Sequence, residues 1–234
     1  MKRKLAFCLV LILAVCCLAP AFGEGKLKVT KKNFYKIISG SYAYGYVMAQ
    51  VENVGDKPIQ LKGATMEIFD KAGEVLGSTD SYSCPMKYLQ PGEHTYLKMY
   101  ASLDPEKLDD VEKNKLSLSD KSDLDRKCIV LPCEFEFKKD VKEGYSTHDY
   151  MYATVTNNTD QPLYSIMTTF AMKDKKENIL FVTSNSFGSS QALMPGSSVL
   201  IKMEMDYNFR KYCEENNKKV KTIDVQAYCY VNKD

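Results

Sequence analysis

The sequence predicts an all-β protein with two tandem β-sandwich domains, each with a short helical segment before its last strand. First, residues 46–99 match residues 150–203 without a gap when the chain is shifted by 104 positions. Second, apolar residues recur at every other position, the period of a half-buried strand. Third, clusters of Gly, Pro, Asn and Asp separate these runs, as turns require.

The repeat sets the domain boundaries. Because the shared residues are core and turn types, the repeat indicates a common fold rather than a common reactive site. It predicts a first domain over residues 24–120, a linker over 121–127 and a second domain over 128–234. The matches pair Ala49, Val51 and Asn53 with Ala153, Val155 and Asn157, Asp70 with Asp174, and Leu89-x-Pro91-Gly92 with Leu193-x-Pro195-Gly196.

Residues 1–23 predict a signal peptide for export. A basic start is followed by the apolar run Leu5 to Leu18, which is too short to span a bilayer. Two cleavage patterns follow, Ala19-Pro20-Ala21 and Ala21-Phe22-Gly23, and the second, which leaves Glu24 first, is preferred. Lipid attachment at Cys16 or Cys17 is disfavoured because Val15 and Cys16, which precede them, are not the small residues that this processing needs. We therefore expect an extracellular or cell-envelope protein with no transmembrane segment in its mature chain.

The charge balance argues against a nucleic-acid partner. Without the basic residues of the signal segment, 29 of the 32 basic residues remain against 30 acidic ones, and only Arg126 and Arg210 are arginines. Nucleic-acid-binding proteins present clustered positive charge and favour arginine. The lysines of this chain are interleaved with acids, as on a solvated surface.

The elements of the first domain follow from period and turns. A strand near residues 27–35 and a break at 39–41 precede a strand over 42–53, whose Val47, Ala49 and Val51 face inward. A hairpin turning at residues 70–73 follows, with Met66 and Ile68 inward. A strand over 96–100 places Leu97 and Met99 inward; in the second domain Phe170, Met172, Ile201 and Met203 take the corresponding places.

Helix signals come late in each domain. Asp104 before Pro105 predicts a short helix over residues 105–112, with Asp104 as its N-cap. Residues 207–215 occupy the matching place in the second domain. The last strands are expected over 115–119 and 220–231.

Five cysteines remain after removal of the signal segment: Cys84, Cys128, Cys133, Cys213 and Cys229. An exported protein can keep disulfides, and an odd number leaves one thiol over. The preferred pair is Cys213 with Cys229, whose loop of 16 residues would contribute about 3 kcal/mol. The alternative is that all five stay reduced. None of the spacings favours zinc.

Met66-Glu67-Ile68-Phe69-Asp70 and its copy resemble the FxLYD domain, an immunoglobulin-like sandwich of secreted and envelope proteins of bacteria. The family pattern is Phe-x-Leu-Tyr-Asp, preceded by Gly-x-Val-x-Asn and followed by a Pro-Gly turn. Phe170 and both aspartates match, whereas Lys173 stands where the pattern has Tyr, and Ala49 and Ala153 stand where it has Gly. The resemblance implies two immunoglobulin-like domains and export, and it brings no catalytic residues.

Reactive motifs are missing from the sequence. His94 and His148 are the only histidines, and neither lies in a nucleophile or metal motif. His94 aligns with Ser198 of the other copy, which indicates a surface or turn histidine. We therefore expect a protein that is not an enzyme and needs no metal or cofactor.

The one candidate binding feature is a strip of tyrosines. Tyr42, Tyr44 and Tyr46 alternate on the strand face opposite Val47, and Tyr150 and Tyr152 repeat the pattern. With Met48 they would form an exposed, partly apolar strip, and such strips often mark contact sites. Alternatively, the rings pack on neighbouring strands or between the domains.

The sequence thus predicts a non-catalytic binding or scaffolding protein of the bacterial cell envelope, whose ligand is a protein or glycan at the cell surface. The alternative is an accessory subunit of a larger surface assembly that docks through the tyrosine strip.

Overall fold

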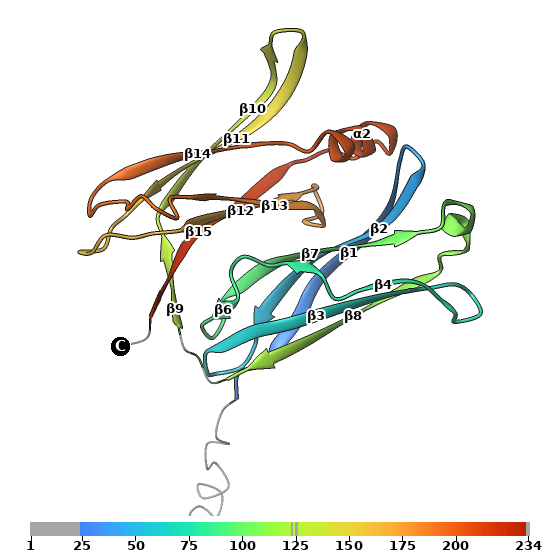
Figure 1. Ribbon diagram of the computed structural model, residues 1–234, viewed down its shortest axis with the longest axis horizontal. Coiled ribbons are helices and arrows are strands. Elements are labelled where there is room, and N and C mark those ends of the chain that lie inside the picture. Colours follow the sequence, from blue (N-terminus) through green and yellow to red (C-terminus); the bar gives the residue numbers. More distant parts are fainter. Residues whose placement is uncertain (1–23, 123, 125, 233–234) are drawn as a thin grey trace, which may run out of the picture.

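The computed structural model describes residues 24–232 except 123 and 125. The predicted signal peptide, and with it the question of lipid attachment, lies outside these residues. The described chain is mostly β-strand in four antiparallel sheets with few helices, which confirms the all-β prediction. The sheets lie in four layers (Figure 1).

The first half contains two facing sheets, named here after a central strand. The β2 sheet has the order β1-β2-β7-β5, with bounds Leu27–Ser39, Tyr42–Asn53, His94–Leu103 and Tyr82–Ser83. In the β3 sheet, β3 pairs with β8 and with β4 and β6; the bounds of β3, β4, β6 and β8 are Ile59–Phe69, Val75–Thr79, Tyr88–Leu89 and Lys113–Lys121. As predicted, Val47, Met66 and Leu97 are fully buried between them.

The second half repeats this arrangement. The β12 sheet has the order β13-β12-β15-β9, with bounds Ile179–Phe187, Ile166–Lys173, Thr222–Asn232 and Arg126–Leu131. The β11 sheet has the order β10-β11-β14, with bounds Cys133–Glu143, Ser146–Thr156 and Ser198–Glu204. Strand pairing repeats with the sequence offset, since Ala49 faces Leu97 and Ala153 faces Ile201. Strand β8 ends at Lys121 and strand β9 begins at Arg126, so each strand includes part of the linker expected over residues 121–127.

Both expected helical segments form. The 3₁₀ helix η1 spans Pro105–Asp110, and its cap Asp104 accepts a hydrogen bond from the Glu106 amide. The α-helix α2 spans Tyr207–Glu215, and its cap Asp206 accepts one from the Phe209 amide. The first is shorter than the 105–112 prediction, and the second has the predicted bounds.

A buried asparagine that both copies keep holds a turn in place in each half. The Asn53 side-chain amide is fully buried and donates to the carbonyls of Lys57 and Leu89, at 2.8 and 3.1 Å. Asn157 does the same in the second copy, toward Gln161 and Leu193, at 2.9 and 2.8 Å. Each asparagine thereby ties a turn to the Leu-x-Pro-Gly segment. Buried polar groups that lose such partners are costly, which explains why both copies carry asparagine here.

The two halves pack face to face and are not separate domains connected only by the linker. The face of the β2 sheet that points away from the β3 sheet lies on the β12 sheet (Figure 1), and Tyr35, Met48 and Tyr96 belong to the same buried cluster as Phe170 and Phe209 of the second half. Met48 is completely buried, so its expected place in an exposed strip is wrong. The reason is that β2 has a core on both faces, one within its own half and one between halves.

The shared cluster predicts that the halves unfold in one transition. Met48→Lys should place an unpaired charge between them and reduce the free energy of unfolding by about 3–5 kcal/mol. Tyr152→Lys is the matched control, because Tyr152 occupies the corresponding position in the second copy but lies on the outer, half-exposed face of the β11 sheet. This control should cost about 1 kcal/mol or less, for one lost cation–π contact with Lys138. Thermal melts followed by circular dichroism would test both, and equal losses would contradict the packing of Met48 between the halves.

Candidate functional site

The tyrosine cluster is the most distinctive surface feature that the structure assembles, and we define it as Tyr42, Tyr44, Tyr46, Tyr100, Tyr35 and Tyr212. Tyr42, Tyr44 and Tyr46 alternate along β2 as predicted. Their neighbouring ring centroids are 6.4 and 6.2 Å apart. Tyr100 of β7 pairs with Tyr46 and places its ring 5.5 Å from that ring and 5.9 Å from the Tyr44 ring.

One end of the cluster is buried at the seam between the halves. The Tyr46 ring stacks on Tyr35 of β1 at 5.4 Å, and Tyr35 stacks on Tyr212 of α2 at 4.7 Å. Burial raises the pKa of Tyr35 well above its ordinary value and also raises that of Tyr46. Both phenols therefore stay protonated. This end of the cluster anchors the other rings and is not itself a contact surface.

The other end is open to solvent. Tyr42 is 65% exposed and Tyr100 is 50% exposed, while Tyr44 between them is half-buried. Tyr44 is paired on both sides, with Ile37 of β1 and Ser102 of β7, whereas Tyr42 pairs only with Ser39 at the end of the β1–β2 hairpin. The exposed end therefore presents aromatic faces and hydroxyl groups from rigid backbone.

Tyr150 and Tyr152 do not join this cluster, because they lie on the β11 sheet at the far side of the second half. The Tyr150 side chain is buried and its hydroxyl donates to Glu143 at 2.7 Å. The Lys202 ammonium lies 3.6 Å above the Tyr150 ring, and Lys138 lies 5.2 Å above Tyr152. These two tyrosines are thus covered by charged side chains, not displayed as a strip.

Sequence reasoning missed three members of the cluster. Tyr100 had a usable signal, since period two places it on the same outward face as Lys98. Tyr35 and Tyr212 had none, because their contact depends on how the halves pack.

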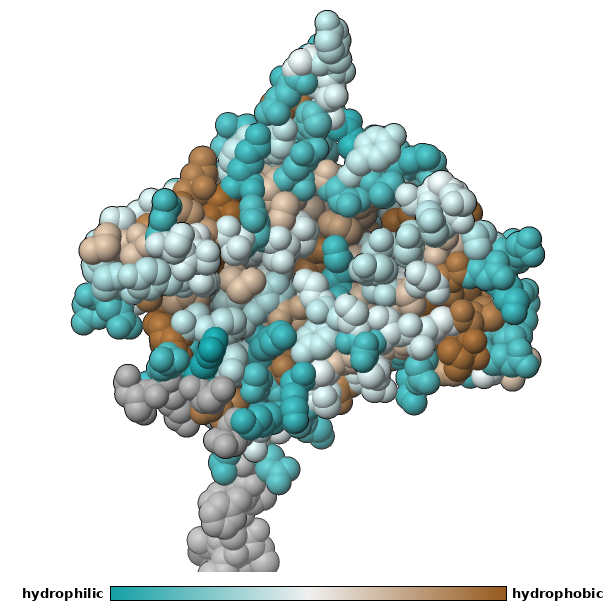
Figure 2. Space-filling view, viewed as in Figure 1, coloured by the Kyte–Doolittle hydropathy of each residue, from teal (hydrophilic) through white to brown (hydrophobic). Residues whose placement is uncertain are grey.

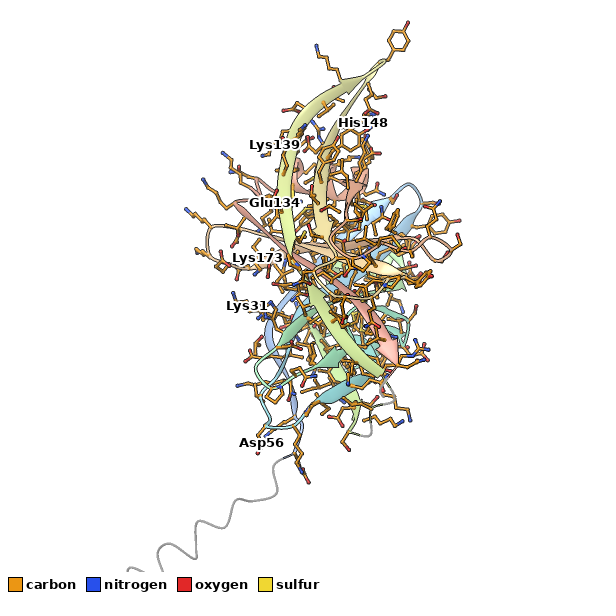
Figure 3. All side chains as sticks on the ribbon, turned by 90° about the vertical axis from the view of Figure 1, so that its left-hand side faces the viewer. Lys31, Asp56, Glu134, Lys139, His148 and Lys173 are labelled. Carbon is orange, nitrogen blue, oxygen red and sulfur yellow. The ribbon has the colours of Figure 1, made fainter. Side chains whose placement is uncertain are left out.

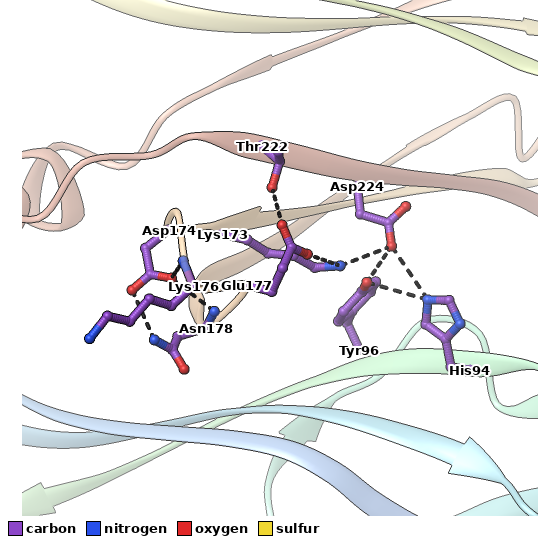
Figure 4. Close-up of polar contacts among 9 residues, drawn as sticks. All are labelled: His94, Tyr96, Lys173, Asp174, Lys176, Glu177, Asn178, Thr222 and Asp224. Atoms are coloured by element: carbon purple, nitrogen blue, oxygen red, sulfur yellow. Dashed lines mark hydrogen bonds and ion pairs between the residues drawn. The ribbon is translucent and has the colours of Figure 1, made fainter.

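A second constellation, the polar clamp, joins the halves and consists of His94, Tyr96, Lys173, Glu177, Thr222 and Asp224 (Figure 4). The Tyr96 hydroxyl donates a very short hydrogen bond to Asp224. His94 Nε2 and the Lys173 ammonium each lie 3.4 Å from the same Asp224 oxygen. Strand β7 of the first half is thereby bound to β15 and β12 of the second.

Glu177 extends the clamp, because it lies 3.8 Å from the Lys173 ammonium and accepts a 3.2 Å hydrogen bond from Thr222. Lys173, which departs from the FxLYD pattern, is buried here with its ammonium 5.3 Å from the Tyr96 ring centroid. His94 was expected to be a surface or turn residue, but it lies on β7 and contacts Asp224.

The electrostatics of the clamp favour a fixed charge state. The hydrogen bond from His94, followed by those of Tyr96 and Lys173, holds the pKa of Asp224 well below its ordinary value despite partial burial. Burial, and then the adjacent carboxylate, raise the pKa of Tyr96 well above its ordinary value. Tyr96 therefore acts as a permanent donor and not as a base, and the arrangement can bind the halves but does not activate a nucleophile.

The expected disulfide is not present. Cys213 lies on α2 and Cys229 lies in the core of β15, and all five cysteines of the described chain are free thiols. Burial raises the pKa of both Cys213 and Cys229 to about 11, which keeps them protonated and unreactive. Within the described chain, no group of three or more His, Cys, Asp or Glu residues is arranged to hold a metal ion.

Comparison with known proteins and a search for membrane-spanning helices complete the description of the chain. The sequence matches no family model and no curated protein. Among the described residues, no helix has the length and apolar character needed to cross a membrane.

Asp224→Asn tests the clamp. It should lower the free energy of unfolding at pH 7 by about 1–2 kcal/mol, because hydrogen bonds to a charged group are lost, reduced by the exposure of about a third of the side chain. The folded pKa of Asp224 is lowered, so its contribution is present above about pH 4, the value of a free aspartate, and is lost as the pH falls through the folded pKa.

Urea titrations between pH 7 and pH 2 would measure this effect. The difference between wild type and Asp224→Asn should shrink below about pH 4. Asp160→Asn, on an exposed turn, is the control and should leave stability unchanged. A difference that stays constant down to pH 2 would contradict the assigned charge state.

Proposed function

We propose that the protein is an exported, non-catalytic binding or scaffolding protein of the bacterial cell envelope, built from two immunoglobulin-like domains of the FxLYD type. The gapless repeat, the predicted signal peptide and the antiparallel sheets of both halves support this proposal. Its contact surface is the exposed end of the tyrosine cluster.

The arrangement of that exposed end carries the proposal. Tyrosine offers a large amphipathic contact area with few rotatable bonds, and it is enriched in the cores of protein interfaces. Here Tyr42 stacks on Tyr44, the Tyr100 ring meets Tyr44 edge to face, and Tyr100 also contacts the half-buried Tyr46. Because their positions are already fixed, a partner would lose little side-chain entropy on binding them.

A protein partner fits this surface better than a ligand held in a pocket, because the exposed rings project from a sheet face. The proposal therefore favours an accessory subunit of a larger surface assembly, with a wall glycan as the second candidate ligand.

The polar residues support a binding role over catalysis. Asn53 and Asn157 are committed to turns, and Asp224 and Tyr96 are committed to the contact between halves. These buried polar contacts thus stabilise the body that displays the tyrosines.

Cross-linking on native cell surfaces with residues 24–234 tests the proposal, since this segment contains every described element. A photo-cross-linker at Ser102, an exposed residue of β7 that pairs with Tyr44 and so lies on the same face as the cluster, should capture one dominant protein. Tyr42→Ser with Tyr44→Ser should reduce its recovery about tenfold or more, as expected for loss of interface anchors.

Tyr145→Ser is the matched control, because Tyr145 is a fully exposed tyrosine at the tip of the β10–β11 hairpin. This variant should capture the partner as well as wild type does. Unchanged capture by the folded double variant would refute the contact role of the cluster. Recovery of glycan fragments in place of protein would favour a ligand-binding module over an assembly subunit.

A further inference from the structure

A groove of about 520 Å³ lies between the projecting end of the β10–β11 hairpin and α2. It exists because β14 ends at Glu204, opposite Tyr150, whereas in the first half β7 follows β2 as far as Ala43. The hairpin therefore continues past its neighbour, and the chain turns into α2 beside it. Figures 1 and 2 show this hairpin standing clear of the body, covered in hydrophilic side chains.

Arg210 of α2 holds the two walls of the groove together. Its guanidinium lies 3.1 Å from Asp140 and 3.5 Å from Asp149 of the hairpin, and 3.2 Å from Glu214 of its own helix. Three carboxylates thus surround one cation. Arg210 balances only one of these three negative charges, but four lysines also line the groove, so its lining side chains carry five positive and three negative charges.

The hairpin wall contains an irregular backbone segment. Pairing between β10 and β11 shifts register between Lys138 and Val141, and Asp140 has a φ of 53°. A left-handed conformation costs energy for a residue other than glycine. The Asp140 amide, which donates to Asp149 at 2.8 Å, helps to offset this cost. Such bulges re-aim neighbouring side chains. Lys139, labelled on the hairpin in Figure 3, is among the residues that line the groove.

Four lysines line the groove without an acidic partner: Lys139, Lys218, Lys219 and Lys221. None of them has a carboxylate within ion-pair distance in the part of the chain that the structure describes, although ion pairs as long as 3.8 Å occur elsewhere. They converge from the hairpin and from the segment that joins α2 to β15. The groove thus carries uncompensated positive charge.

The floor of the groove is apolar, with Phe137, Met205, Val220 and the Cys213 thiol. Lys139 and Lys218 line the groove together with this floor, and Cys213 has charged groups of both signs around it, because burial and then Glu214 raise the pKa of its thiol whereas Lys218 and Lys139 lower it. Converging cations over an apolar floor suit an anion that carries an apolar part. The volume lies within the range of small-molecule sites, about 300–1,000 Å³.

We propose that this groove binds a phosphorylated ligand, with the four lysines holding the phosphoryl group and the apolar floor contacting the attached organic part. Lysine binds phosphate as a point charge, whereas carboxylates are better matched by the planar fork of arginine. The only arginine in the groove is already occupied by acids. The ligand chemistry fits both a soluble phosphorylated polyol and the headgroup of an anionic lipid.

Two probes separate these sources. Pyrophosphate is titrated calorimetrically into residues 24–234, and vesicles of phosphatidylglycerol and phosphatidylcholine in equal parts are tested by co-sedimentation. Lys139→Gln with Lys218→Gln and Lys219→Gln should weaken binding about tenfold, at roughly two- to threefold for each exposed charge. Raising the salt concentration from 0.1 to 1 M should also weaken it, because the Debye length falls from about 10 to about 3 Å.

The control variant removes three exposed lysines from the first half: Lys28→Gln, Lys57→Gln and Lys62→Gln. It has the same net charge as the test variant and should keep wild-type binding. Binding of pyrophosphate supports a soluble ligand, and binding of the vesicles alone supports a lipid headgroup. No binding of either probe, equal loss in the two variants, or tighter binding of a polyglutamate peptide than of pyrophosphate would overturn the proposal.

Discussion

The packing of the β2 sheet on the β12 sheet is the contact on which the rest of the molecule depends. It buries Met48 and Tyr96 against the second half and places the polar clamp at its edge. Apolar burial supplies the non-directional part of this contact. The clamp adds direction, because Asp224 is satisfied only when Tyr96, His94 and Lys173 meet around it. The same contact brings α2 against Tyr35 and so fixes the base of the tyrosine cluster.

The outer faces of the stack differ from its inner ones. Asn33 and Tyr35 pair with Met48 and Tyr46 on the inner face, whereas Glu136 and Lys138 stand in the corresponding places on the outer β11 sheet. On the outer β3 sheet, Glu67 forms an ion pair with Lys115. At the corresponding position of the β12 sheet, Ala171 pairs with Asp224. Charged outer faces resist the addition of another copy, as the capping units of repeat proteins do.

Much of the fold could be predicted from sequence, because local rules decide it. Alternation identified the buried faces of Val47, Met66 and Leu97, and Asp104 with Pro105 identified η1. The residues of α2 were predicted from the position of the repeat.

The docking of the halves could not be predicted in this way. Alternation divides a strand into one buried and one exposed face, and it therefore placed Met48 outside. A strand covered on both sides gives no such signal when its second partner comes from a distant part of the chain. His94 was misleading for the same reason, since its partner Asp224 lies in the other half.

The shared and unshared parts of the two copies have different roles. Residues that both copies keep, such as Asn53 with Asn157 and Asp70 with Asp174, hold turns and strand ends in place. The two surfaces proposed to bind a ligand come from the differences. The first copy has Tyr100 where the second has Glu204, and the second stops β14 early, which leaves its hairpin projecting beside α2. A fold repeated by duplication needs its common residues for stability, so new contacts can arise only where one copy is free to change. The tyrosine cluster and the lysine-lined groove both lie at such places.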